Sequence, residues 1–205
     1  LACYRRGEEQ ARKAGDAALT LEALEGQAKI YLDTIQPGRA DGILRRALAL
    51  LEEEQAANGH RTFRLVSMMA ENLVNAGRAA EAEVWFARRN APAPDEDPVN
   101  LEARLHLRTG RLREAERILE RRKAAGEAHP GFRLPQAHRE TDLLLSLIAS
   151  LFGEPERARR LGEAALVQGI RSKAPFVEAC ARMRMGHAAQ LAHKDERAAA
   201  LDCYT

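Results

Sequence analysis

Residues 101–120, LEARLHLRTGRLREAERILE, decide the fold that we predict for this chain. The stretch is typical of two short amphipathic helices joined by Gly110, which can adopt the left-handed conformation that ends a helix. Ala103 lies seven residues before this glycine and Ala115 five after it. Small side chains at such positions let paired helices approach closely. Because one hairpin of this size cannot bury its own apolar face, the stretch predicts one repeat in a stack.

The same pattern recurs along the chain, as in Ala70, Gly77 and Ala82. The position of Leu119, four residues after the second small residue, can be aligned in every repeat. The aligned residues are Tyr4, Leu44, Phe86, Leu119, Gly162 and Tyr204, and the steps between them are 40, 42, 33, 43 and 42 residues. We therefore expect a single domain over 1–205 made of about five helix-turn-helix repeats and a leading partial repeat. The expected repeats are 1–16 (partial), 17–59, 60–98, 99–135, 136–173 and 174–205.

Helical periodicity and turn residues set the expected helix boundaries. Asp16 is expected to cap the helix that follows it, and Pro37 with Gly38 to end that helix. The proline-rich stretches Asn90–Pro98 and Glu127–Pro135 are expected to be loops. Outside 101–125, the expected helices are Leu1–Asp16, Leu21–Ile35, Ala40–Glu54, Thr62–Asn75, Ala79–Arg89, Gln136–Phe152, Glu156–Gln168, Ala174–Ala192 and one from Glu196 onward.

The composition agrees with an all-α protein and argues against several functions. Aromatic residues make up only 4% of the 205 residues and charged residues 30%, with strong helix formers dominant. A net charge of +2 with Arg and Glu interleaved predicts no direct contact with nucleic acid. No apolar run approaches the roughly 20 residues of a membrane span, so no membrane contact is expected. Three cysteines without a CxxC motif suggest reduced thiols and a cytoplasmic location. The chain starts at Leu1 and ends within a helical pattern, so we expect a longer parent protein.

No pattern in the sequence predicts catalysis. None of the six histidines lies in an HExxH motif, so no metal site and no cofactor are expected. A nucleophile elbow and a glycine-rich phosphate loop are also absent from the sequence. The chain is therefore predicted not to be an enzyme.

The small–Gly–Ala–large spacing resembles the tetratricopeptide repeat, or TPR, although most steps exceed its usual length of about 34 residues. This resemblance implies a TPR-like right-handed superhelix, an α-solenoid of stacked hairpins. The longer repeats resemble the sensor region of MalT-like and AfsR-like bacterial transcription regulators. The stretches that carry this resemblance are AKIYLDTIQPGRADGILRRALALLEEE and HRETDLLLSLIASLFGEPERARRLGEAALVQG. In that group, such a stack lies beside a nucleotide-binding module and a DNA-binding domain, neither of which is encoded here.

In a TPR-like stack, the first helix of each repeat lines a concave groove. Four arginines on such helices could clamp an anionic group, because guanidinium groups match carboxylate and phosphate. The alternative is that most of them are ordinary surface arginines in an arginine-rich chain. The candidate groove residues are Arg64, Glu71, Asn75, Asn100, Arg104, Arg108 and Arg182.

Three functions stay open at this point. The first is a sensor or partner-binding domain of a bacterial transcription regulator, with a protein, peptide or small-molecule effector in the groove. The second is a scaffold that binds a peptide or helix and has no role in transcription. The third is self-association through the end faces of the stack.

Overall fold

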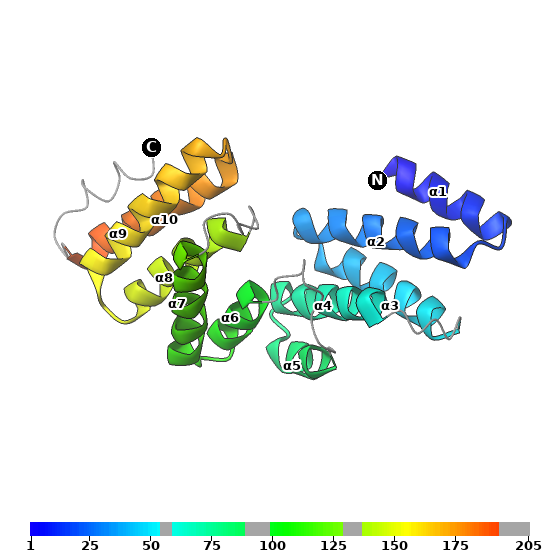
Figure 1. Cartoon of the computed structure of the whole chain (residues 1–205), viewed down its shortest axis with the longest axis horizontal. Coiled ribbons are helices and arrows are strands. Elements are labelled where there is room, and N and C mark those ends of the chain that lie inside the picture. Colours follow the sequence, from blue (N-terminus) through cyan, green and yellow to red (C-terminus); the bar gives the residue numbers. More distant parts are fainter. Residues whose placement is uncertain (54–58, 89–98, 129–136, 193–205) are drawn as a thin grey trace. The chain divides into compact units, whose positions relative to one another are not determined.

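The computed structural model describes residues 1–53, 59–88, 99–128 and 137–192, and these residues form helices joined by turns (Figure 1). Over this part of the chain there is no strand, which confirms the predicted all-α class. The helices are α1 (Ala2–Lys13), α2 (Ala17–Asp33), α3 (Pro37–Glu53), α4 (Gly59–Asn75), α5 (Ala79–Ala87), α6 (Val99–Arg108), α7 (Leu112–Ala128), α8 (Ala137–Leu151), α9 (Pro155–Arg171) and α10 (Pro175–Ala192).

The chain divides into two compact units, Leu1–Thr109 with α1 to α6 and Gly110–Thr205 with α7 to α10. We call them unit 1 and unit 2. In the predicted repeats, α2, α4, α6, α8 and α10 are the first helices and α1, α3, α5, α7 and α9 are the second helices.

In unit 1, α2 packs between α1 and α3, as Figure 1 shows, and α4 packs against α3 and α5. The first helices also touch one another directly, α2 against α4 and α4 against α6. A shared apolar core links α2, α3, α4, α5 and α6 and includes Leu24, Leu44, Met69 and Leu105. The first helices of unit 1 are thus held side by side.

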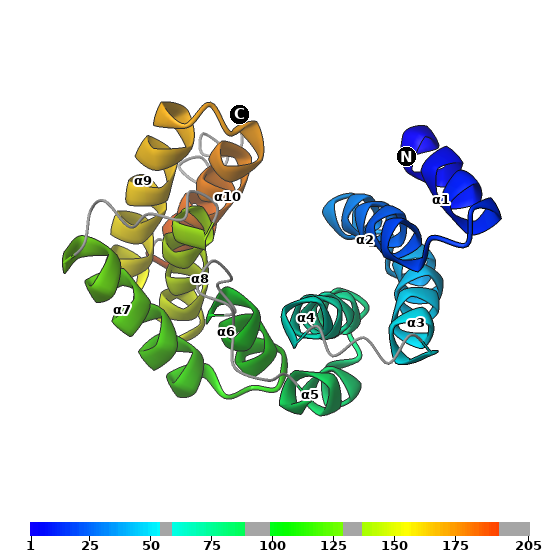
Figure 2. The same ribbon diagram turned by 45° about the vertical axis from the view of Figure 1, so that its right-hand side comes forward.

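In unit 2, α9 lies between α8 and α10 in sequence and packs against both, and α8 also contacts α7 and α10 (Figure 2). Leu143 of α8, Ala165 of α9 and both Val177 and Ala181 of α10 form a common buried cluster. This cluster fixes α8, α9 and α10 to one another.

Glycines end four of the helices in the left-handed conformation, as the spacing predicted for Gly110. Gly15, Gly77, Gly110 and Gly153 have φ values of 69°, 75°, 76° and 73°. At Gly77, its N–H donates to Val74 O at 3.1 Å and the Arg78 N–H donates to Leu73 O at 2.8 Å. This is the Schellman pattern, which satisfies the last carbonyls of a helix. The flanking small residues Ala70, Ala82, Ala103, Ala115, Ser146 and Ala158 are all fully buried, as close helix packing requires.

Two turns adopt the same geometry without glycine. Ile35 has a φ of 51° and Lys173 a φ of 52°. The Ile35 N–H donates to Leu32 O at 3.0 Å, and the Gln36 N–H to Tyr31 O at 2.8 Å. The break in the chain therefore comes before Pro37, which is the first residue of α3 rather than part of the break. Proline suits the first turn of a helix because its missing N–H has no intrahelical partner there.

We expect Ile35→Gly to raise the free energy of unfolding by about 1 kcal/mol, because a β-branched residue is strained at positive φ. The Ile35 side chain is 65% exposed, so its removal sacrifices little packing. Urea unfolding followed by circular dichroism measures the change. The matched control is Gly77→Ala, since a Cβ at Gly77 meets nothing within 4 Å. The free energy of unfolding of that variant should fall by about 1 kcal/mol, because alanine is strained at positive φ. If both substitutions changed the free energy of unfolding in the same direction, this explanation would be contradicted.

Other predicted boundaries fall close to the observed ones. The Leu19 N–H donates to the Asp16 carboxylate at 2.9 Å, which confirms the predicted cap. The helix predicted over Ala79–Arg89 ends at Ala87, and the one predicted to begin at Leu21 begins at Ala17. Three predicted segments fall wholly or mostly outside the described residues: the loops Asn90–Pro98 and Glu127–Pro135 and the helix from Glu196 onward.

Candidate binding surface

A stripe of polar residues runs along α2 on one helical face. Glu22, Glu25, Lys29 and Asp33 follow at intervals of three or four residues, which places them above one another on a helix. Glu22, Lys29 and Asp33 are exposed, whereas Glu25 is buried. The stripe is therefore accessible to solvent on both sides of Glu25, but Glu25 itself is not.

Two arginines of α4 pair with the Glu25 carboxylate and cover it. Arg64 donates from Nη2 to Oε2 of Glu25, and the Nε of Arg61 lies 3.1 Å from Oε1. The glutamate is only 8% exposed, so both interactions compensate for the cost of removing its charge from water. This cluster joins the first helix of one predicted repeat to the first helix of the next.

A second cluster joins α4 to α6 in the same manner. Arg104 donates from Nη1 to Oε1 of Glu71 at 3.0 Å, and from Nη2 to Oδ1 of Asn75. Glu71 and Asn75 lie one helical turn apart on α4, so one guanidinium group can reach both. Three of the predicted groove residues thus form one hydrogen-bonded group.

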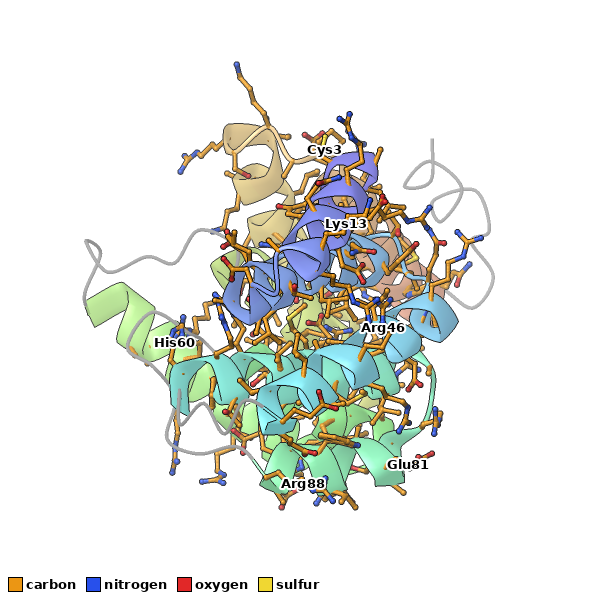
Figure 3. All side chains as sticks on the ribbon, turned by 90° about the vertical axis from the view of Figure 1, so that its right-hand side faces the viewer. Cys3, Lys13, Arg46, His60, Glu81 and Arg88 are labelled. Carbon is orange, nitrogen blue, oxygen red and sulfur yellow. The ribbon has the colours of Figure 1, made fainter. Side chains whose placement is uncertain are left out.

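The arginine and its acceptor lie about one repeat apart in the sequence at each of these contacts. The separation is 39 residues for Arg64 and Glu25 and 33 residues for Arg104 and Glu71. Second helices are joined likewise. Arg46 of α3 donates to Glu8 of α1, 38 residues away, and Figure 3 shows Arg46 on the side of α3 next to α1. The first-helix and second-helix faces of unit 1 thus use the same kind of contact.

In unit 2, Arg157 of α9 joins three carboxylates. It donates to Glu116 at 2.5 Å, 41 residues away, to Glu120 at 2.7 Å and to Glu154 at 2.9 Å. Burial by itself would raise the pKa of the Glu116 carboxyl, but hydrogen bonds from Arg157 and Arg113 outweigh burial and hold this pKa below its usual value. The ionised form of Glu116 is therefore the one that stabilises unit 2.

We expect Glu116→Gln to lower the free energy of unfolding at neutral pH by about 1 kcal/mol. A carboxylate with a lowered folded-state pKa stabilises the fold above its unfolded-state pKa, and this contribution is lost as pH falls through the folded-state pKa. The difference between variant and wild type should therefore begin to shrink as the pH approaches the usual pKa of 4.5 and vanish only below the lower folded-state pKa. Urea unfolding of both proteins at a series of pH values measures this difference in the free energy of unfolding. Glu114→Gln, an exposed position on α7, is the control and should match wild type throughout.

The other predicted groove residues are placed differently. Asn100 is buried on α6, so its side chain is not presented to solvent. Arg108 is exposed at the end of α6, and Arg182 is exposed on α10 in unit 2. The guanidinium groups of Arg64 and Arg104 already donate hydrogen bonds to acceptors on the neighbouring first helix. An arginine clamp for an anionic ligand stays a prediction, and any such ligand would compete with Glu25 and Glu71.

Sequence reasoning missed Arg61, Glu8 and Arg46 as members of the inter-repeat contacts. A search for arginines that follow a glutamate by one repeat length could have found the pair Glu8 and Arg46. The α2–α4 face also holds unused hydrogen-bonding capacity. Ser67 Oγ and Arg64 Nε are buried and have no hydrogen-bond partner in the described part of the chain.

No protein-family model matches the chain, and no curated protein matches it either. Within residues 1–53, 59–88, 99–128 and 137–192, no three side chains of His, Cys, Asp or Glu are grouped so as to hold a metal ion. None of the helices in that part of the chain combines the length and apolar character required to cross a bilayer.

Proposed function

We propose that this chain is a non-enzymatic docking domain of helical repeats, which binds a peptide or helical segment of a partner protein along its first helices. The observation that carries the proposal is the repeat-spaced arginine contact between first helices, from α2 to α4 and from α4 to α6. Such contacts hold polar positions of successive repeats next to one another. A continuous row of this kind suits an elongated partner better than a compact one.

The proposal includes a TPR-like right-handed superhelix in which the hairpins stack in register. Its support is the agreement between the predicted repeat steps and the arginine contacts. The step from Phe86 to Leu119 is 33 residues, and so is the separation of Arg104 and Glu71. Small buried residues on both sides of the glycine turns add to this support, because they let neighbouring helices approach closely.

A narrower proposal rests on the sequence resemblance alone: the docking domain receives a signal within a bacterial transcription regulator. In this proposal a bound effector favours one curvature of the stack and so shifts the parent protein towards an assembly-competent state. The sequence that flanks the chain in its parent protein tests this. A phosphate loop or a DNA-binding motif there would favour the regulator, and further repeats alone would favour a scaffold.

The docking proposal is tested with peptides selected against the chain from a random library of displayed peptides. We expect the affinity of a selected peptide, measured by isothermal titration calorimetry, to fall at least tenfold in Lys29→Glu, an exposed change on the α2 stripe. The control is Glu52→Lys, an exposed change on the second helix α3. Failure to select any peptide, or binding that depends on Glu52 and not on Lys29, would contradict the proposal.

A further inference from the structure

Arg184 on α10 differs from the arginines described above because no acceptor among the described residues compensates its charge. Its side chain is partly buried, and its Nε is buried without a hydrogen-bond partner. No carboxylate of the described residues pairs with Arg184 or shifts its pKa. Arg64, Arg104 and Arg157, in contrast, each donate to one or more carboxylates. A partly buried guanidinium group with no partner is costly, so its position calls for an explanation.

The neighbours of Arg184 on the same face of α10 are Cys180, one turn before it, and His187, one turn after it. Cys180 packs against the buried cluster shared by α8, α9 and α10, so this face of the helix points towards the protein. Burial lowers the pKa of Arg184, and no described carboxylate opposes this effect. Burial and the charge of Arg184 together lower the pKa of His187. Cys180 opposes the lowering of the Arg184 pKa, but burial and the charge of Glu140 raise the pKa of its thiol, so the neutral thiol supplies Arg184 with no full negative charge.

We propose that Arg184 is the anchor of an oxyanion-binding site in unit 2, which takes a carboxylate or phosphate group of a ligand. The planar guanidinium group offers donors that match either oxyanion, and partial burial strengthens a charge-assisted hydrogen bond. The site is independent of the docking surface proposed on α2, α4 and α6, and either proposal can fail without the other. It also differs from the sequence prediction, which selected the exposed Arg182 on this helix.

The first test is thermal unfolding of the whole chain in rising concentrations of inorganic phosphate or acetate, with ionic strength held constant by chloride. An anion that binds only the folded protein raises the midpoint in a concentration-dependent way. The rise is expected in wild type and in the control Arg182→Gln, and not in Arg184→Gln. A rise with one anion alone identifies the oxyanion that the site prefers. No rise with either anion, or the same rise in all three proteins, would overturn the proposal.

A second measurement separates ligand binding from a structural role. Without anions, Arg184→Met should unfold at the same temperature as wild type or higher, because the replacement removes a charge that lacks a partner. A clearly lower midpoint would mean that the guanidinium group is compensated within the chain, which would overturn the proposal.

The His187 pKa, followed by NMR, gives a readout that does not depend on stability. Phosphate bound at Arg184 should offset the arginine charge and raise this pKa in wild type and in Arg182→Gln. The same addition should leave the His187 pKa unchanged in Arg184→Gln. An equal response of His187 in all three proteins would place the anion elsewhere and overturn the proposal.

Discussion

Leu44→Ala is expected to lower the free energy of unfolding of unit 1 by about 3 kcal/mol, because it removes a fully enclosed side chain and leaves a cavity. Leu44 is 0% exposed and lies in the core shared by α2 to α6 of unit 1. It occupies the position that is aligned with Leu119, which is also 0% exposed in unit 2. The repeat position is therefore a core position in both units.

Urea unfolding followed by the fluorescence of Trp85 measures this change, because Trp85 packs against the same core in unit 1. The matched control is Leu19→Ala, in which the side chain is 54% exposed and the expected change is within about 0.5 kcal/mol. If Leu44→Ala were no more harmful than Leu19→Ala, the assignment of Leu44 to the core would be wrong.

Gly26→Ala is expected to lower the free energy of unfolding by about 2 kcal/mol, although alanine is the better helix former. A Cβ at Gly26 would lie 2.3 to 2.6 Å from ring atoms of Tyr4, so either the ring or α1 as a whole would have to move away from α2. Gly42→Ala in α3 is the control, because a Cβ there meets nothing within 4 Å. The control should gain about 0.5–1 kcal/mol from helix propensity, so the two glycine variants should change stability in opposite directions.

A double-mutant cycle with Tyr4→Ala tests the cause of the Gly26 effect. Removal of the ring should make Gly26→Ala neutral or stabilising, with a coupling energy of about 2 kcal/mol between the two positions. Purely additive changes would show that the Tyr4 ring is not what excludes a side chain at Gly26. Thermal unfolding of the four proteins in the cycle provides the measurement.

Local signals in the sequence predicted most of the secondary structure. The spacing of small residues around Gly77, Gly110 and Gly153 located three turns, and Asp16 located a cap. The turns at Ile35 and Lys173 could not be predicted in this way, because propensity favours glycine at positive φ.

The aligned repeat position shows a second limit of the sequence. Leu44 and Leu119 are fully buried there, but Tyr4 is 44% exposed and packs on Gly26, whereas Gly162 is itself approached by Met185. In the first pair the large residue, Tyr4, lies on the second helix α1 and the glycine on α2. In the other pair the glycine lies on the second helix α9 and the large residue, Met185, on α10. Spacing identifies such a position, but it cannot identify which helix provides the large side chain.

The candidate surface was predictable only in part. Heptad-like spacing placed Glu71 and Asn75 on one face of α4, but their shared contact with Arg104 depends on how α4 and α6 are packed. The choice between Arg182 and Arg184 on α10 depends on how that helix is rotated about its axis. Long-range pairing and helix rotation are properties of the packed structure, so a single sequence did not determine them.

The central claim is that the side-by-side first helices of unit 1 form one docking face. Backbone amide chemical shifts of the chain, recorded with and without a peptide selected against it, test this claim most directly. We expect the largest changes to fall on the polar positions of α2, α4 and α6, around Lys29, Ser67 and Arg104. Changes concentrated on the second helices α3 and α5, with these three positions unaffected, would contradict it.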